Sequence, residues 1–264
     1  MIKGLVSVIV PTFDRLIKLN RCIKGIANQS YKDVEIIIVS DGYSKNIENF
    51  VIKSPLNNIS YFHTKKWNGF PSESRNMGIN LSKGEYIAFC DDDDQWVEEK
   101  IEIQLKFLKK NQLKFTSSNA FLRRGYEQHG EELFHKKEEV KLTNLSLIYS
   151  NKIITSSVLF RRDLFGDDYQ ELFPVNLNVG EDWIAWISLK LGCKDEFGYL
   201  DKGLVIYDVS SDSLSSKLDI KILINQFFII NRTLLKENHL LLSLCSFVFF
   251  ILRLIRHFLN FLTG

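Results

Sequence analysis

Short apolar runs alternate with segments of helical spacing along the first 110 residues, and no other feature constrains the fold as strongly. The runs at residues 5–10 and 34–39 are rich in Val and Ile, which is typical of strands buried on both faces of a parallel sheet. Between them, Leu16, Leu19, Ile23 and Ile26 recur at helical spacing. This order predicts right-handed βαβ units and an α/β fold with a mostly parallel sheet flanked by helices.

The same patterns place the individual elements. The predicted strands are residues 5–10, 34–39, 59–62, 86–90, 156–160 and 204–207. The predicted helices are residues 16–26, 72–81 with Ser72 as the N-cap, 97–110, and one that follows Gly180 and runs to residue 191. Residues 123–141 are highly charged and are predicted to form a loop. Because ligands gather at the carboxyl ends of parallel strands, Asp14, Asp41 and residues 91–94 are expected to converge on one edge of the sheet.

Four successive aspartates, residues 91–94, follow the predicted strand at 86–90 directly. Like charges so close together raise one another's pKa and oppose folding. A divalent cation would remove this penalty, because hard ions prefer carboxylate oxygen. The alternative is that Asp94 caps the next helix and the other three carboxylates are solvated.

Five segments, taken in order, resemble the motifs of family 2 glycosyltransferases, which have the GT-A fold. They are residues 5–15 (LVSVIVPTFDR), 38–42 (IVSDG), 67–69 with 74–79 (WNG and SRNMGI), 89–96 (FCDDDDQW) and 180–183 (GEDW). The resemblance extends over about the first 190 residues. It implies a GT-A catalytic domain at residues 1–215 and a helical tail at residues 216–264.

The resemblance also implies a binding site for the nucleotide-sugar donor. Pro11, Thr12, Phe13 and Asp41 would hold the uracil ring of a UDP-sugar, since a carboxylate accepts a hydrogen bond from a ring N–H. Arg75 would contact the base or the diphosphate, for which a guanidinium fork is suited. Asp91 and Asp92 would lie near the ribose, and Asp93 would be the main ligand of Mn²⁺ or Mg²⁺. The cation would stabilise the departing nucleoside diphosphate.

Asp182 is the candidate base for the acceptor hydroxyl, and Glu181 would orient it or bind the acceptor. Direct displacement of this kind inverts the anomeric configuration. Without the resemblance, the two acids also fit the first turn of a helix, where negative charge is favoured. Trp96 and Trp183 are candidates for stacking on the acceptor sugar, with core packing as the alternative; for Trp186 packing is favoured.

The tail differs in composition from the rest of the chain. Residues 240–252 are uncharged and almost wholly apolar, but 13 residues are too few to span a bilayer, which needs about 20. Arg253, Arg256 and His257 then share one face of an amphipathic segment. A basic amphipathic helix beside an apolar one fits attachment to an anionic membrane surface. Packing of both helices on the domain, or a dimer contact, is the alternative.

The four cysteines have no zinc or redox spacing and fit a reduced cytosolic setting. The N-terminus runs straight into the first predicted strand, so no signal peptide is expected and the catalytic part is expected in the cytoplasm, on the inner face of the cell membrane. A net charge of +2 gives no argument for a nucleic-acid partner.

The function expected from these features is that of an inverting, metal-dependent glycosyltransferase. The size, the single domain and the apolar tail resemble those of bacterial enzymes that build O-antigen or other surface-polysaccharide repeat units. This resemblance implies transfer of a sugar, with UDP-glucose as the specific hypothesis, to an undecaprenyl-diphosphate-linked sugar, forming a β-1,3 linkage. Two alternatives remain. A sugar nucleotidyltransferase should carry a glycine-rich, lysine-containing phosphate loop, and residues 11–15 contain neither residue type. A non-catalytic nucleotide-sugar-binding module would bind UDP without consuming a donor.

Overall fold

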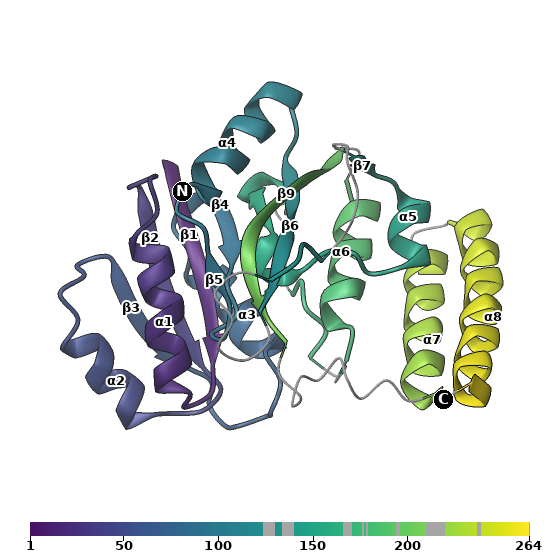
Figure 1. The fold of residues 1–264 in the computed structure, drawn as a ribbon, viewed down its shortest axis with the longest axis horizontal. Helices are drawn as coiled ribbons and strands as arrows, with labels where there is room; N and C mark the ends of the chain where they lie inside the picture. The colour runs from purple at the N-terminus through teal and green to yellow at the C-terminus, as the bar shows by residue number, and fades with distance from the viewer. Residues whose placement is uncertain are drawn as a thin grey trace.

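The computed structural model of the chain describes residues 1–123, 130–133, 140–165, 171–175, 177, 179–193, 196–209, 220–236 and 239–263 (Figure 1). Its strands are β1 (Ile2–Thr12), β2 (Val34–Ser40), β3 (Ile59–His63), β4 (Gly84–Phe89), β5 (Gln95–Trp96), β6 (Phe115–Arg123), β7 (Val140–Leu142), β8 (Leu159–Arg161) and β9 (Phe197–Asp208). Its helices are α1 (Leu16–Ala27), α2 (Lys45–Ile52), α3 (Ser72–Leu81), α4 (Lys100–Asn111), α5 (Asn144–Tyr149), α6 (Glu181–Leu191), α7 (Ile220–Lys236) and α8 (Leu240–Thr263), with 3₁₀ turns at Thr155–Ser157 and Arg162–Leu164.

The strands form one mixed sheet in the order β3-β2-β1-β4-β8-β6-β9-β5, and β7 pairs with β9 outside this path. β3, β2, β1 and β4 run parallel to one another, as the sequence predicts. β8 runs antiparallel to β4 and β6, whereas β9 is parallel to β6 and antiparallel to β5 and β7. The α/β class with a helix-flanked sheet and C-terminal helices is confirmed, and the parallel pairing lies mainly in its first half.

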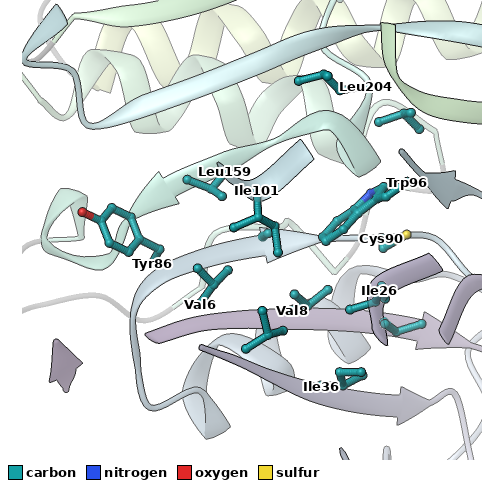
Figure 2. Close-up of a cluster of buried hydrophobic side chains, with 14 of the residues drawn as sticks. Val6, Val8, Ile26, Ile36, Tyr86, Cys90, Trp96, Ile101, Leu159 and Leu204 are labelled. Carbon is teal, nitrogen blue, oxygen red and sulfur yellow. The ribbon is translucent and has the colours of Figure 1, made fainter. Parts of the chain in front are cut away.

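Two apolar clusters cover the two faces of the sheet. Val8 of β1 and Ala88 of β4 belong to the first, together with residues of α1 and α4. Ile9 and Phe89 belong to the second, together with residues of α3 and α6. Successive strand residues point to opposite faces, so a strand that is apolar throughout is one covered on both sides. Figure 2 shows part of the first cluster, with Val6, Val8, Ile26, Ile36, Tyr86, Cys90, Trp96, Ile101, Leu159 and Leu204 labelled.

Two local predictions are wrong. Pro71, not Ser72, occupies the N-cap position of α3, because the Pro71 carbonyl accepts the helical hydrogen bond from the backbone N–H of Arg75 (2.9 Å). The strand predicted at residues 156–160 begins only at Leu159, after a 3₁₀ turn. Ser156 lies in that turn because its hydroxyl is bonded to the aspartate segment described below.

The predicted loop at residues 123–141 falls largely on residues 124–129 and 134–139, which lie outside the described residues. Where the chain is described, it is tied to the sheet. The backbone N–H of Leu122 donates to Glu131 O (2.9 Å), and that of Leu133 donates to Ala120 O (2.8 Å). The predicted domain boundary at residues 215 and 216 also lies in an undescribed stretch.

The tail folds as two helices, α7 and α8, which lie side by side at the end of the molecule opposite α2 (Figure 1). The apolar and basic segments, expected as two neighbouring helices, form the single helix α8 because no breaker separates them. Ile230 and Leu234 of α7 join the second core cluster, whereas Leu241, Leu244 and Val248 of α8 are exposed. Across the described ranges, no helix combines the length and apolar composition needed to cross a membrane.

Lys100, in the first turn of α4, is fully buried. Its Nζ donates to Gln104 Oε1 (2.7 Å) and lies 4.0 Å from the centroid of the Trp96 ring. Burial lowers the pKa of Lys100 to about 7, against a small opposing effect of Cys90. The folded chain therefore favours the neutral amine.

This burial makes the stability of the fold depend on pH. In the unfolded chain the pKa of Lys100 returns to its ordinary value of 10.5, so between about pH 7 and pH 10 the unfolded state binds more protons than the folded state. We expect the free energy of unfolding to rise with pH in this window, with a slope approaching about 1.4 kcal/mol per pH unit. Lys100→Met should remove this contribution to the slope, as measured by urea unfolding at several pH values.

Lys106→Met is the matched control, since Lys106 is an exposed lysine of the same helix. It should leave the slope unchanged. Parallel stability–pH curves for the wild type and Lys100→Met would contradict the assignment.

Candidate active site

A cavity of about 1040 Å³ opens where β1, β2 and β4 end and α6 begins. This is the edge at which a parallel sheet gathers its ligands. Its lining brings together most of the predicted site residues: Pro11, Thr12, Phe13, Asp41, Arg75, Asp91, Asp93, Glu181, Asp182 and Trp183. Asp92 and Trp96 are not part of this lining.

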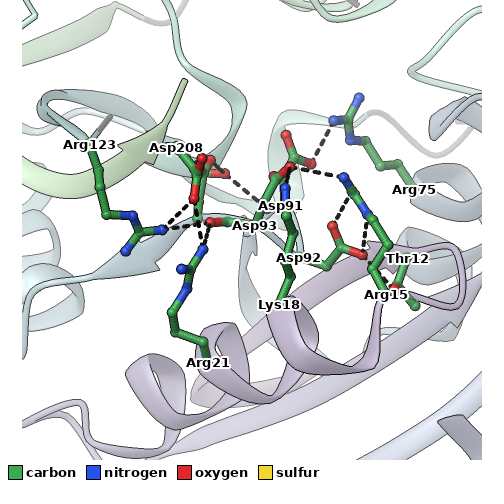
Figure 3. A network of polar contacts seen from close by, with 12 residues as sticks. Thr12, Arg15, Lys18, Arg21, Arg75, Asp91, Asp92, Asp93, Arg123 and Asp208 are labelled. Atoms are coloured by element: carbon green, nitrogen blue, oxygen red, sulfur yellow. Dashed lines mark hydrogen bonds and ion pairs between the residues drawn. The ribbon is translucent and has the colours of Figure 1, made fainter. Parts of the chain in front are cut away.

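Asp91 and Asp93 are the two members of the aspartate run that line the cavity, with side chains 28% and 21% exposed. Asp91 Oδ1 accepts from Arg75 Nη2 at 2.7 Å. Asp93 Oδ2 accepts from Arg15 Nη1 at 3.0 Å, and Lys18 Nζ lies 3.6 Å from the same oxygen. Figure 3 shows these carboxylates between cationic side chains from α1 and α3.

Asp92 is fully buried and is not part of the cavity lining. Its carboxylate accepts from Thr12 Oγ1 (2.6 Å) and from Arg15 Nε (3.1 Å) and Nη2. Burial raises the pKa of Asp92 to about 6, although Arg15 and Thr12 oppose the shift. The expected position of Asp92 near the ribose does not match this placement, because the chain turns at Asp91–Asp94, where the backbone N–H of Asp94 donates to Asp91 O (3.0 Å), and Asp92 is directed at Thr12 and Arg15. Asp92 instead ties the end of β4 to the end of β1.

Asp94 is also buried, and the interpretation of Asp94 as a helix cap is wrong. Its carboxylate accepts from Ser156 Oγ (2.5 Å) and from the backbone N–H of Asp208 (3.1 Å). The N-cap of α4 is Glu99, because the chain forms the short strand β5 before the helix begins. Burial, reinforced by Asp91 and Asp93, raises the pKa of Asp94 well above its ordinary value.

Arg75 connects the aspartate run with the start of α6. Its buried guanidinium donates through Nη2 to Asp91 and through Nη1 to Glu181 Oε1 (2.9 Å), and it lies 5.2 Å from the Phe173 ring centroid. Burial alone would lower the pKa of Arg75, but the charges of Asp91 and Glu181 outweigh it and raise the pKa. Burial also raises the pKa of Glu181 to about 7, with Asp182 adding to the shift and Arg75 opposing it.

Asp182 is held by different partners from those expected. Glu181 is bonded to Arg75, and the groups that orient Asp182 are Asn151 Nδ2 (3.2 Å), Thr155 Oγ1 (3.2 Å) and the backbone N–H of Trp183 (2.7 Å). Burial raises the pKa of Asp182, and the charge of Arg75 opposes this. A raised pKa brings a carboxylate closer to the range in which a base accepts a proton efficiently.

Asp41 binds the loop that covers the end of β2. Its oxygens accept from the backbone N–H groups of Asn68 (3.0 Å) and Gly69 (2.6 Å) and from Thr64 Oγ1 (3.2 Å). This anchoring places the exposed Trp67 beside Phe13, with ring centroids 5.7 Å apart. The two rings form an aromatic wall of the cavity, a surface on which a planar ring stacks favourably.

The three tryptophans beyond Trp67 occupy different surroundings. Trp96 is buried, donates from Nε1 to Ser156 O (2.8 Å) and lies away from the cavity, so it presents no face to an acceptor. Trp183 lines the cavity and donates to Leu147 O (2.5 Å). Trp186 is fully buried in the second core cluster, which agrees with the packing interpretation.

Sequence reasoning missed the partners of the carboxylates. Arg15, Lys18 and Arg21, at the start of α1, all face the aspartate run. They are three residues apart in the sequence, and this helical spacing could have identified them. Asp208, at the end of β9, pairs with two arginines, whose bonds lower its pKa despite partial burial. The missed residues are Arg15, Lys18, Arg21, Arg123, Asn151, Thr155 and Asp208.

Asp91 and Asp93 have the chemistry for a cation of the magnesium type. Such an ion takes one or two carboxylates from the protein and fills its remaining positions with water and substrate phosphate. Within the described ranges, no group of three or more His, Cys, Asp or Glu side chains is arranged to hold a metal by itself. Asp91 and Asp93 are each partly exposed in the cavity, so either carboxylate can reach a cation that also binds a phosphate ligand.

Comparison with known proteins identifies the class. The family model described as Glycosyl transferase family 2 matches residues 7–166. An uncharacterized glycosyltransferase of Rickettsia conorii, RC0461, is 34% identical over 204 residues, which are 75% of this chain and 32% of that protein. The chain spans only about a third or less of the length of the first curated relatives it matches. The Escherichia coli UDP-Glc:alpha-D-GlcNAc-diphosphoundecaprenol beta-1,3-glucosyltransferase WfaP is 26% identical over 256 residues, which are 96% of this chain and 95% of WfaP.

Solved structures share the fold. Staphylococcus aureus TarS 1–349 in complex with UDP matches with a TM-score of 0.69 at 20% identity, covering 88% of this chain and 65% of that one. The mannosyltransferase PcManGT from Pyrobaculum calidifontis, in complex with GDP-Man and Mn²⁺, matches with a TM-score of 0.58 at 13% identity, covering 88% and 63%. The fold is GT-A, and the chain belongs to glycosyl transferase family 2.

Proposed function

We propose that the chain transfers a sugar from a UDP-sugar to a sugar carried on a lipid diphosphate, with inversion at the anomeric carbon. One observation carries the proposal: the partly exposed carboxylates of Asp91 and Asp93 line the same cavity as Asp182, which comes from the start of α6. Transfer needs carboxylates that hold a cation at the leaving group and a second carboxylate that takes the proton of the acceptor hydroxyl. The two must lie on opposite sides of the transferred sugar.

The donor would enter with its uracil against Phe13 and Trp67, near Pro11, Thr12 and Asp41. Asp91 in the same cavity suits a ribose hydroxyl, and Arg75, bonded to it, suits the diphosphate. Asp93 would be the protein ligand of Mn²⁺ or Mg²⁺. When bound, the cation supplies charge neutralisation for the departing diphosphate.

Asp182 would accept the proton of the acceptor hydroxyl. As this proton leaves, the hydroxyl oxygen of the acceptor bonds to the anomeric carbon of the donor sugar, and the bond from that carbon to the diphosphate breaks. Asn151 and Thr155 hold one of its oxygens in place. Glu181 remains paired with Arg75, and Trp183 borders the cavity on the acceptor side. Attack from the side opposite the leaving group gives inversion.

The acceptor and donor classes draw support from relatives. WfaP is a glucosyltransferase that acts on a diphosphoundecaprenol-linked sugar, and a Campylobacter jejuni beta-1,3-glucosyltransferase named for a PP-undecaprenol substrate is 38% identical over 91 residues. We therefore propose UDP-glucose as the donor, a β-1,3 linkage, and a role in building O-antigen or other surface-polysaccharide repeat units. Residues 1–215 would be the catalytic domain and residues 216–264 the tail.

The decisive experiment is a donor panel with the purified chain. UDP-glucose, UDP-N-acetylglucosamine, UDP-galactose and GDP-mannose are supplied with Mn²⁺ or with a chelator, and the acceptor is N-acetylglucosamine on a synthetic alkyl diphosphate. Consumption of a UDP-sugar only with the cation, with a new disaccharide by mass spectrometry, is the expected result. UDP binding without donor consumption would identify a binding module, and formation of a UDP-sugar from UTP and a sugar phosphate would identify a nucleotidyltransferase.

The exposed apolar side chains of α8 support peripheral attachment of the tail to the inner face of the cell membrane, with the catalytic domain in the cytoplasm. We expect the chain to float with phosphatidylglycerol vesicles in a density gradient. If the chain stays at the bottom of the gradient with both anionic and neutral vesicles, packing on the domain or dimer formation would remain as the role of the tail.

A further inference from the structure

Arg253 extends from the C-terminal helix α8 to the rim of the active-site cavity. Its guanidinium carbon lies 4.2 Å from the centroid of a ring of Trp183, the residue that follows the proposed base. Nη2 donates to the carbonyl oxygens of Ile148 (3.1 Å) and Tyr149, at the end of α5. Stacking and carbonyl bonds fix the plane of the guanidinium at this rim.

Arg253 has no carboxylate ion-pair partner among the residues that the structure describes. Arg15 and Arg75, which line the same cavity, each form an ion pair with an aspartate. Burial lowers the pKa of Arg253 to about 10, with only Tyr149 opposing the shift. A partly desolvated cation without a counterion is an unfavourable arrangement that an anionic ligand relieves.

Lys152 gives the same rim a second positive charge. It follows α5 and lines the cavity beside Asn151, which holds Asp182. In the part of the chain that the structure describes, Lys152 also has no carboxylate partner in an ion pair. The two cations thus lie on the Asp182 side of the cavity, away from the pairs that Arg15 and Arg75 make with the aspartate run.

We propose that Arg253 and Lys152 bind the diphosphate of the acceptor, so that α8 supplies part of the acceptor site; this rests on the proposed transfer to a lipid-diphosphate-linked sugar. A guanidinium fork and a lysine match the oxygens of a diphosphate. The exposed apolar residues of α8, including Leu244, Phe247 and Val248, offer a surface for the attached hydrocarbon chain. The sugar at the other end of the diphosphate would then lie next to Asp182.

The test is direct binding of a short polyprenyl diphosphate by calorimetry, with the donor site saturated by UDP and Mn²⁺. Arg253→Gln should weaken binding of this probe by about tenfold or more, since it removes charge-assisted hydrogen bonds. Lys152→Gln, which leaves Trp183 and its contacts unchanged, should weaken it several-fold. Arg232→Gln, on the exposed surface of α7 and away from the cavity, is the matched control and should have no effect.

Arg253→Lys provides a variant that keeps the charge, and UDP affinity reports whether each variant retains the native donor site. Probe binding within twofold of the wild type in both Arg253→Gln and Lys152→Gln would overturn the proposal. Inorganic pyrophosphate should bind more weakly than the polyprenyl diphosphate. Equal affinity would show that a free phosphate compound, not a lipid, is the ligand of this rim.

The outcome is separable from that of the proposed function. If the variants lose probe binding but the wild type consumes no donor, the proposed diphosphate site is supported and the proposed transferase activity is contradicted. If the wild type transfers sugar to a diphosphate-linked acceptor and the KM for this acceptor is the same in Arg253→Gln, the proposed transferase activity is supported and the proposed diphosphate site is contradicted.

Discussion

Replacement of Asp182 with Asn is expected to lower kcat by about 10²–10⁴-fold, the range over which a positioned base accelerates a reaction. The amide keeps the shape of the side chain and can still bond to Asn151 and Thr155, but it cannot take a proton from the acceptor hydroxyl. Because Asp182 lies on the acceptor side, the affinity for UDP should stay within about twofold of the wild type. Initial rates at saturating donor and calorimetric binding of UDP measure the two quantities.

The pH profile gives a second measurement of the same role. Burial raises the pKa of Asp182, and only the deprotonated carboxylate accepts a proton, so kcat should fall as the pH drops through that raised pKa. The acidic limb should therefore lie above the ordinary aspartate pKa of 3.8. Asp163→Asn, on an exposed aspartate remote from the cavity, should leave rate and profile unchanged. Full activity in Asp182→Asn would reject this residue as the base and leave Glu181 as the next candidate.

Asp93→Ala is expected to reduce transfer by about a thousandfold, which corresponds to the several kcal/mol that a cation contributes to charge stabilisation at a leaving group. The distinguishing measurement does not depend on turnover. In the wild type, Mn²⁺ should tighten the binding of UDP, and in Asp93→Ala this dependence should largely disappear. Asp93→Asn should resemble Asp93→Ala, because an amide oxygen carries no charge. An unchanged response of UDP affinity to Mn²⁺ in both variants would remove Asp93 as the ligand.

The first half of the fold could be predicted because its strands are buried on both sides. Strands such as β1 and β2 are apolar almost throughout, and a short apolar run of this kind is typical of a strand inside a parallel sheet. β6 was missed for the opposite reason. Thr116, Ser117, Ser118 and Asn119 are fully buried in this strand, although their composition is typical of a loop. Their burial depends on pairing with β9, about eighty residues further along the chain, which no local pattern records.

The site could be predicted as far as its motifs lie on neighbouring strand ends. Asp41, Arg75, Asp91 and Asp93 line one cavity because β1, β2 and β4 are adjacent and parallel. The partners of these groups could not be predicted in the same way. Asn151, for example, reaches Asp182 from the segment after α5, and a single polar residue in an irregular segment carries no sequence signal.

The aspartate run shows how little a repeated residue type says about a repeated role. The chain turns at this run, with the backbone N–H of Asp94 donating to Asp91 O, so that Asp91 and Asp93 line the cavity while Asp92 and Asp94 are buried within the protein. The inward pair joins β4 to β1 and to β9, so its loss would weaken the fold whether or not substrate is present. The outward pair is partly exposed in the cavity, where a ligand can reach it. Four identical residues in a row thus divide between two surroundings, two holding the fold together and two facing the cavity.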